Sequence, residues 1–353
     1  VDHYGLWERS WDQKEPLVGE RGAATGIQRW NFRQRELPGI GPGVIRFLLP
    51  ITLFGNITDL GYTLPALYED VQSMEMTEEQ GEQYVMATRT LLQRAIELSR
   101  HGDAGALSVW FNTVRFRPAS CFRNELVSYS GKKGGNIHLE LPAVIHPQEW
   151  LPKERTLAEL VRKNMHLDRK TLCFVEQTGT RDIRTRLKQA IEALAPGGNM
   201  TLVEVGVLSA GDMAPARREA WIRKSAPWMD AMLVNPKLVE TGLDLVMFSD
   251  LVFYEVTTSL YVLWQSMRRV WRLGQEKDVN VRFLAYKDTM EEEILRRMGQ
   301  KMKYAQLLYG KEAAGVLVES DSADDLQREI INAALEGKAF KSAGEAITGI
   351  FTT

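Results

Sequence analysis

Cysteine is scarce in this sequence, and long apolar runs are missing from it. Only Cys121 and Cys173 occur among 353 residues, too few for a disulfide framework or a zinc site. We therefore expect a reducing compartment and predict a cytoplasmic location, with Cys173 buried in an apolar run. No stretch of about 18 consecutive apolar residues occurs, so we predict no membrane span. The start lacks a secretory signal and an initial Met, which predicts a fragment of a longer protein.

Several nucleotide-binding motifs are absent as well. The chain has no G-x-x-x-x-G-K-[ST] loop, in which backbone N–H groups and a Lys hold phosphates. The stretch GERGAATG near the start lacks that Lys. There is no D-E-x-H or D-E-x-D sequence to hold magnesium. No G-x-G-x-x-G or D-x-D follows an expected strand, which weighs against a dinucleotide-binding enzyme or a nucleotide-sugar enzyme. Those enzyme classes stay open as alternatives.

Neither sign of charge dominates. The net charge is −2, so any nucleic-acid surface must be a local patch instead of a basic domain. Apolar residues make up 44% and charged residues 25%, as in globular proteins. Residues 1–50 are rich in Gly, Pro, Arg and Trp and are expected to form loops with short helices. Acids after Thr77 predict a helix over Glu78–Arg100 with Thr77 as its N-cap. Residues 102–148, with the basic loop GKKGGN, are expected to be a linker.

After Leu151 short apolar runs alternate with helical patterns. Expected strands begin near Thr171, Thr201, Asp230, Leu251 and Val279, and expected helices cover Ile183–Leu194, Ala214–Ser225, Leu263–Val270 and about Met290–Leu308. Alternation of this length predicts an α/β fold with an open, mostly parallel sheet covered on both faces. Ligands of such sheets bind beyond the carboxyl ends of the strands. Three segments are expected there: EQTGTRDI from Glu176, NPKLVETGLDL from Asn235 and QSMRRVWRLGQ from Gln265.

The third segment concentrates cations and a polar amide. At helical spacing, one face is expected to carry Gln265, Arg268, Arg269 and Arg272. Such a cluster is costly to bury unless it meets anions, and the planar guanidinium can donate two hydrogen bonds to a phosphate. A solvated basic helix, paired with acids such as Glu276, is the plain alternative.

The order of these segments resembles the second half of a superfamily-two helicase. QSMRRVWRLGQ resembles motif VI in its Swi/Snf-like form, NPKLVETGLDL resembles motif V, TLCFVEQTGT resembles motif IV, and REAWI resembles the segment between IV and V. LPALYEDVQSMEMTEEQGEQY resembles the stretch that joins the two motor lobes. The resemblance covers most of residues 64–310. Two positions depart from the Swi/Snf pattern, because Arg268 replaces Asp and Trp271 replaces His; we expect Trp271 to be a packing residue.

The resemblance implies a RecA-like second lobe and a role for each matching residue. Arg272, as arginine finger, and Arg269 would reach the γ-phosphate of ATP. The other expected ATP-binding residues are Gln265, Gly242, Asp244 and Arg268, and the expected nucleic-acid contacts are Gln177, Thr178, Thr241 and Arg218. ATP and Mg²⁺ would be held mainly by a first lobe upstream of Val1. Lys153 and Glu154 are expected to begin a helix.

These implications define the function to be tested. We expect residues 1–148 to be the tail of the first lobe or an accessory segment, residues 149–310 to be the second RecA-like domain, and residues 311–353 to be a helical tail. The full protein would be an ATP-dependent helicase or translocase acting on nucleic acid, with DNA as the first choice. The chain alone is predicted to be inactive in ATP hydrolysis. A motor-like scaffold or nucleic-acid-binding module that has lost catalysis is the alternative.

Overall fold

The chain divides into two compact units, residues 1–61 with 300–318 and residues 62–299 with 319–353. The computed structural model describes residues 5–12, 31–40, 61–131, 134–196, 202–211, 214–239, 243–299 and 323–335. In the first unit, strands β1 (Gly5–Asp12) and β2 (Asn31–Ile40) form an antiparallel ladder. These strands stand where the sequence predicted loops with short helices. The expected domain limits at residues 148 and 310 stay a prediction.

The second unit is built on a six-stranded sheet with the order β3-β10-β9-β6-β8-β7. Every pair of neighbours is parallel. The strands are β3 (Leu67–Met74), β6 (Thr171–Phe174), β7 (Val205–Leu208), β8 (Ala231–Val234), β9 (Asp250–Phe253) and β10 (Val279–Tyr286). The three middle strands β9, β6 and β8 are buried along their whole length, as expected for a parallel sheet covered on both faces. The predicted α/β, RecA-like fold is thus confirmed.

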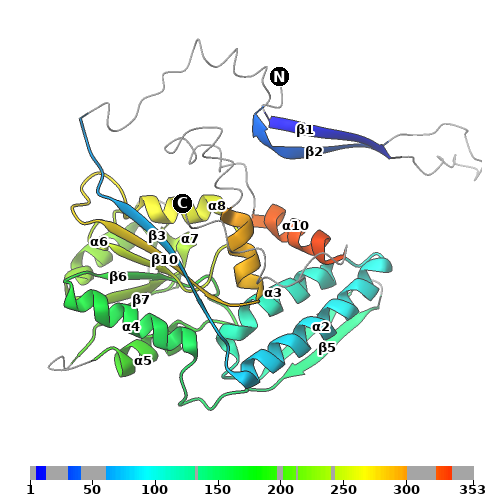
Figure 1. The fold of residues 1–353 in the computed structure, drawn as a ribbon, viewed down its shortest axis with the longest axis horizontal. Coiled ribbons are helices and arrows are strands. Elements are labelled where there is room, and N and C mark those ends of the chain that lie inside the picture. Colours follow the sequence, from blue (N-terminus) through cyan, green and yellow to red (C-terminus); the bar gives the residue numbers. More distant parts are fainter. Residues whose placement is uncertain are drawn as a thin grey trace, which may run out of the picture. The chain divides into compact units, whose positions relative to one another are not determined.

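Helices cover both faces of this sheet (Figure 1). One face carries α4 (Pro152–His166) and α5 (Arg184–Leu194), which pack on each other. The other face carries α6 (Pro215–Ser225), α7 (Pro236–Val239) and α8 (Leu260–Arg268). Residues 290–299 are helical, and the rest of the helix expected up to Leu308 lies outside the described residues. Helix α10 spans Ala323–Leu335.

An insertion between β3 and α4 has more structure than the predicted linker. Helix α2 (Glu78–Arg100) has the predicted limits, and α3 (Gly105–Ser120) packs against it. The strands β4 (Glu125–Ser130) and β5 (Asn136–Leu141) pair in an antiparallel hairpin. The side chain of Thr77 accepts a hydrogen bond from the Gln80 backbone, and the Gln80 side chain accepts one from Thr77. This reciprocal cap fixes the start of α2.

Two apolar layers hold the sheet. On one side, Phe253 stacks on Phe174 with ring centroids 4.7 Å apart and on Phe283 at 5.1 Å. On the other, Cys173 is fully buried in the cluster that α4 and α5 cover. Burial raises the pKa of the Cys173 thiol well above its ordinary value. The prediction that Cys173 is a buried core residue is confirmed.

Candidate functional site

The carboxyl ends of β6, β8 and β9 bring polar residues together. Phe174 pairs with Val234 on one side and Phe253 on the other, so the residues just beyond these strands are neighbours. Asn235 follows β8, and Glu255 follows β9. From β6 the chain continues to β7 at one side of the sheet, and the later strands β8, β9 and β10 then return toward the other side. Ligands of open parallel sheets bind at the carboxyl edge where the strand order reverses in this way. The structure therefore places the first expected segment at the carboxyl edge.

Glu176, two residues beyond β6, is held by three other parts of the fold. Its backbone N–H donates to Glu255 Oε2 at 2.7 Å, and its carbonyl accepts from Asn235 Nδ2 at 2.5 Å. Its carboxylate accepts a hydrogen bond from Arg115 of α3, which also donates to the carbonyl of Val256. The N–H of Gln177 donates to the same Glu255 oxygen at 2.7 Å. The turn after β6 is thereby fixed to two strand ends and to the insertion.

Glu255 is a buried acid, with 2% of the residue exposed. Burial raises its pKa to about 7, and the hydrogen bond from the Gln177 backbone opposes that rise. Sequence reasoning missed Glu255, Arg115 and Asn235 as functional candidates. Of the three, only Asn235 had a sequence signal for a functional role, because it is the first residue of the second segment.

The candidate nucleic-acid residues are only partly together. Gln177 is half-buried and Thr178 is exposed, both at the carboxyl edge. Arg218 is half-buried and belongs to α6, not to the turn that carries Gln177 and Thr178. Thr241 lies outside the described residues, and so does Gly242 of the expected ATP-binding set.

Asp244, another residue of the expected ATP-binding set, follows Thr241 and Gly242 in the second segment. Its Oδ1 is buried and has no hydrogen-bond partner among the described residues. An unpaired buried carboxylate oxygen is costly, so this position is open to a donor group.

The third segment differs from its prediction. Helix α8 ends at Arg268, Arg269 is its C-cap, and Arg272 lies in the following turn. The four polar residues therefore do not share one helical face. Arg268 is exposed, with its guanidinium carbon 5.9 Å from the centroid of the Trp264 ring. Gln265 and Arg269 are half-buried, whereas Arg272 is exposed.

The turn after α8 is anchored on the approach to β9. The amide of Gln275 donates to the carbonyls of Val246, Phe248 and Val270 at 3.1, 2.9 and 3.2 Å. The backbone N–H of Leu245 donates to the carbonyl of Arg269 at 3.0 Å. The end of the second segment and the third segment are thus joined at the amino ends of β9 and β10. The third segment does not end at the carboxyl edge as predicted, because α8 runs back along the sheet.

Trp271 is an anchoring residue. Its indole Nε1 donates to the carbonyl of Pro65 at 2.8 Å, just before β3, and Val279 donates to the carbonyl of Ala66 at 2.8 Å. These bonds agree with the predicted packing role of Trp271. They leave Arg272, the next residue, on the surface, and Arg272 makes no ion pair within the described part of the chain. A solvated guanidinium without a carboxylate partner fits the binding of an anion such as phosphate.

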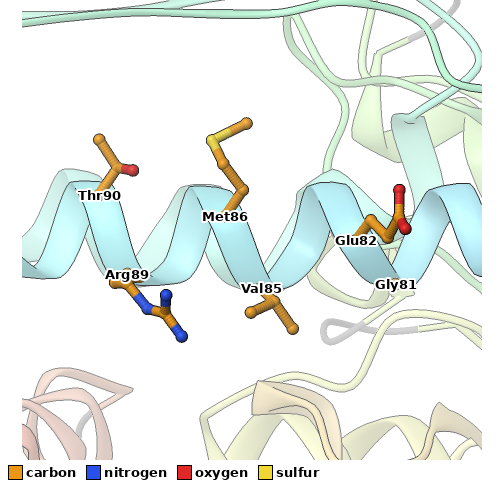
Figure 2. Close-up of a pocket in the computed structure, with 6 residues that line it drawn as sticks. All are labelled: Gly81, Glu82, Val85, Met86, Arg89 and Thr90. Carbon is orange, nitrogen blue, oxygen red and sulfur yellow. The ribbon is translucent and has the colours of Figure 1, made fainter.

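A hollow of about 540 Å³ borders the first segment, because Thr180 and Arg181 line it together with residues of α3 and β4. Another, of about 560 Å³, runs along α2 and is lined by Gly81, Glu82, Val85, Met86, Arg89 and Thr90. Figure 2 shows Met86 and Thr90 on one side of the helix and Val85 and Arg89 on the other, so no set of side chains converges on one ligand. Among the described residues, no three His, Cys, Asp or Glu side chains gather to hold a metal ion, and no described helix is long and apolar enough to cross a membrane.

Parts of this chain are similar in sequence to parts of known proteins. The chromatin-remodeling ATPase INO80 of Arabidopsis thaliana is 42% identical over 76 residues, which is 22% of this chain and 5% of that protein. The helicase-like transcription factor CHR27 of the same plant is 26% identical over 140 residues, 37% of this chain and 13% of that protein. The TATA-binding protein-associated factor MOT1 of Saccharomyces cerevisiae is 31% identical over 108 residues, 30% of this chain and 6% of that protein.

These matches span a small part of each relative. No protein-family model matches the chain. Among solved structures, the C-terminal part of the Fun30 ATPase domain superposes with a TM-score of 0.51 at 18% identity, covering 76% of this chain and 99% of that one. At that identity the match establishes a shared fold.

Proposed function

Because this chain is similar to the C-terminal half of Swi/Snf-like superfamily-two ATPases, we propose that it supplies the second motor domain of an ATP-dependent nucleic-acid translocase. The observation that carries the proposal is Arg272, an exposed guanidinium in a turn that Gln275 and Trp271 anchor. An arginine finger needs such a rigid base and a free head. The order of motifs IV, V and VI along the chain supports the same assignment.

ATP with Mg²⁺ would supply the phosphoryl group, held mainly by the first lobe. On this chain, Arg272 would donate hydrogen bonds to phosphate oxygens at the cleft between lobes, with Arg269 beside it. Arg268 and Gln265 are further candidates there, and the orphaned oxygen of Asp244 would take a donor from motif V or the nucleotide. Charge that develops on the transferred group is stabilised by such a fork of donors.

Nucleic acid would lie at the other edge of the sheet, against the turn of Gln177 and Thr178. The two regions stand at opposite ends of the strands, since one follows β6 and the other precedes β10. Thr241 and Arg218 are proposed to extend the nucleic-acid contacts. DNA is the first choice, and a cytoplasmic location stays a prediction. We also propose that the chain without a first lobe does not hydrolyse ATP.

The test uses the complete reading frame, extended upstream of Val1. ATP hydrolysis is measured with and without DNA for the wild type, for Arg272→Ala and for Arg223→Ala. Arg223 is a matched control because it is exposed on α6 and, within the described part of the chain, pairs only with Glu219 one turn away. The finger predicts a loss of about 10³-fold or more in the DNA-stimulated rate for Arg272→Ala, with no loss for the control.

A second candidate is a motor-like scaffold that binds nucleic acid without catalysis. The orphaned Asp244 oxygen and the half-buried Arg218 would serve binding alone equally well. DNA binding without hydrolysis in the complete wild-type protein would favour the scaffold and contradict the proposed motor.

A further inference from the structure

Glu255 follows β9, and its buried carboxylate accepts hydrogen bonds from the backbone of the turn after β6. Its Oε2 accepts from both Glu176 and Gln177 at 2.7 Å. Its Oε1 is buried and has no hydrogen-bond partner among the residues that the structure describes. Burying a carboxylate is unfavourable unless its bonds compensate, so a packing role alone does not account for an acid at this position.

Charged groups from three elements surround it. Glu176, beyond β6, raises the pKa of Glu255, while Arg115 of α3 and Lys153 of α4 lower it. Burial is the strongest influence, and the pKa lies at about 7. The side chain therefore changes charge near neutral pH, and its charged form is the stronger acceptor for the two N–H groups.

Glu255 holds the start of a loop formed by residues 177–181, called the 177–181 loop below. At its start, the loop is fixed through Glu255, Arg115 and Asn235. At its end, Arg181 donates to Glu125 and, at 2.9 Å, to Thr113. Residues 178–180 between these anchors are exposed. The loop is thus clamped at both ends with its middle open to solvent.

We infer that Glu255 is a positioning residue for nucleic-acid binding, fixing the direction in which the 177–181 loop leaves the sheet so that Gln177 and Thr178 present their polar groups to a phosphate backbone. The inference rests on the proposed function, because it takes these two residues as strand contacts. Arg115 completes the clamp, since it ties Glu176 to Val256 on the Glu255 side.

Two measurements test the inference, on Glu255→Ala, Glu255→Gln and the control Glu192→Gln. Glu192 is a matched control because it lies exposed on α5 and, among the residues that the structure describes, pairs only with Lys188 one turn away. The first measurement is hydrogen exchange at the Glu176 and Gln177 amides of this chain. Loss of the shared acceptor should speed exchange by about tenfold or more in Glu255→Ala, the factor that matches one hydrogen bond. Glu255→Gln should retain protection, because its amide oxygen can still accept.

The second measurement is the DNA concentration that gives half-maximal ATPase stimulation in the complete protein. Glu255→Ala should raise it by about tenfold, with the rate at saturating DNA and the KM for ATP unchanged. Glu255→Gln should restore it at pH 6 and should lack the tightening that the wild type shows between pH 6 and pH 8.

The outcomes separate the inference from the proposed function. A wild type without DNA-stimulated hydrolysis removes the proposed function and, with it, the inferred role in strand binding. A stimulated wild type whose Glu255→Ala variant exchanges faster yet keeps the same half-maximal DNA concentration overturns the inference alone. Unchanged exchange in Glu255→Ala overturns it too. If Glu255→Ala does not fold, a Glu255→Gln variant with the wild-type pH profile overturns the inference, and a flat profile supports it.

Discussion

The ammonium group of Lys153 is fully buried and donates a hydrogen bond of 2.5 Å to the carboxylate of Glu291. The same nitrogen lies 4.9 Å from the ring centroid of Tyr254 and 5.4 Å from that of Tyr286. Lys153 belongs to the first turn of α4, as predicted, where Glu154 accepts from the Leu151 backbone at 2.7 Å. The pair therefore joins the start of α4 to the helical residues 290–299 across the end of the sheet.

Lys153→Met should destabilise the second unit strongly. It leaves Glu291 as a buried charge without its partner, which typically costs about 3–5 kcal/mol in unfolding free energy. Urea denaturation checks the loss, with Lys163→Met, exposed on the same helix, as the control. Adding Glu291→Gln to Lys153→Met should recover part of the loss, since both charges are then gone. Equal midpoints for Lys153→Met and the control would contradict the buried pair.

The raised pKa of Glu255 should appear in the pH dependence of stability. The folded state binds the proton more tightly than the unfolded chain, whose carboxyl has its ordinary pKa of 4.5. The contribution of Glu255 is therefore fully present below about pH 4.5 and is lost as pH rises through about 7. The free energy of unfolding of the wild type should fall more steeply over this range than that of Glu255→Gln. Parallel curves would show that Glu255 does not titrate in this window.

Gly274 and Gly81 should respond in opposite directions to alanine. Gly274, between Arg272 and Gln275, has a φ of +94°, a left-handed backbone that disfavours a side chain, so Gly274→Ala should lose about 1–2 kcal/mol. Gly81 lies in α2 with open space where an alanine Cβ would stand, so Gly81→Ala should gain about 0.5–1 kcal/mol. Thermal unfolding of both variants checks the difference, and a shift of the same sign in both would refute it.

Arg117 should be irreplaceable even by another cation. Its guanidinium, 2% exposed, donates hydrogen bonds to the Gln83 side chain and to the carbonyls of Ser120, Arg123, Leu141 and Pro142. A lysine has one nitrogen in place of this fork. Arg117→Lys should therefore cost about 2–4 kcal/mol through carbonyls left without donors. The half-exposed Arg162, changed to Lys, is the control in a urea titration, and equal losses would dismiss the special role.

Local signals account for what the sequence predicted well. The start of α2 follows from Thr77 and the acids of the first turn, Glu78 and Glu79. The middle strands follow from apolar runs such as TLCFVE. Both kinds of signal are read from neighbours in the sequence, so they need no knowledge of the rest of the fold.

Distant contacts account for what it missed. The end of α8 depends on the bond from Leu245 to the Arg269 carbonyl, and helical spacing carries no sign of that bond. The bonds that hold Glu176 join it to Arg115, 61 residues away along the chain, and to Glu255, 79 residues away. Strand β3 lies in the stretch that was expected, by resemblance, to join two motor lobes, and half of its residues are polar. Its pairing with β10 becomes visible only in the fold.

The pairing of β3 with β10 also determines how the domain would respond to tension. Eight residue pairs join these parallel strands, from Val279 with Leu67 to Tyr286 with Met74. A pull between the chain entering β3 and the chain leaving β10 acts along the strands in opposite directions. All the ladder hydrogen bonds then share the load in shear, whereas an antiparallel hairpin pulled from its open end breaks them one after another. The outer seam of the sheet is thus arranged to carry force without separating.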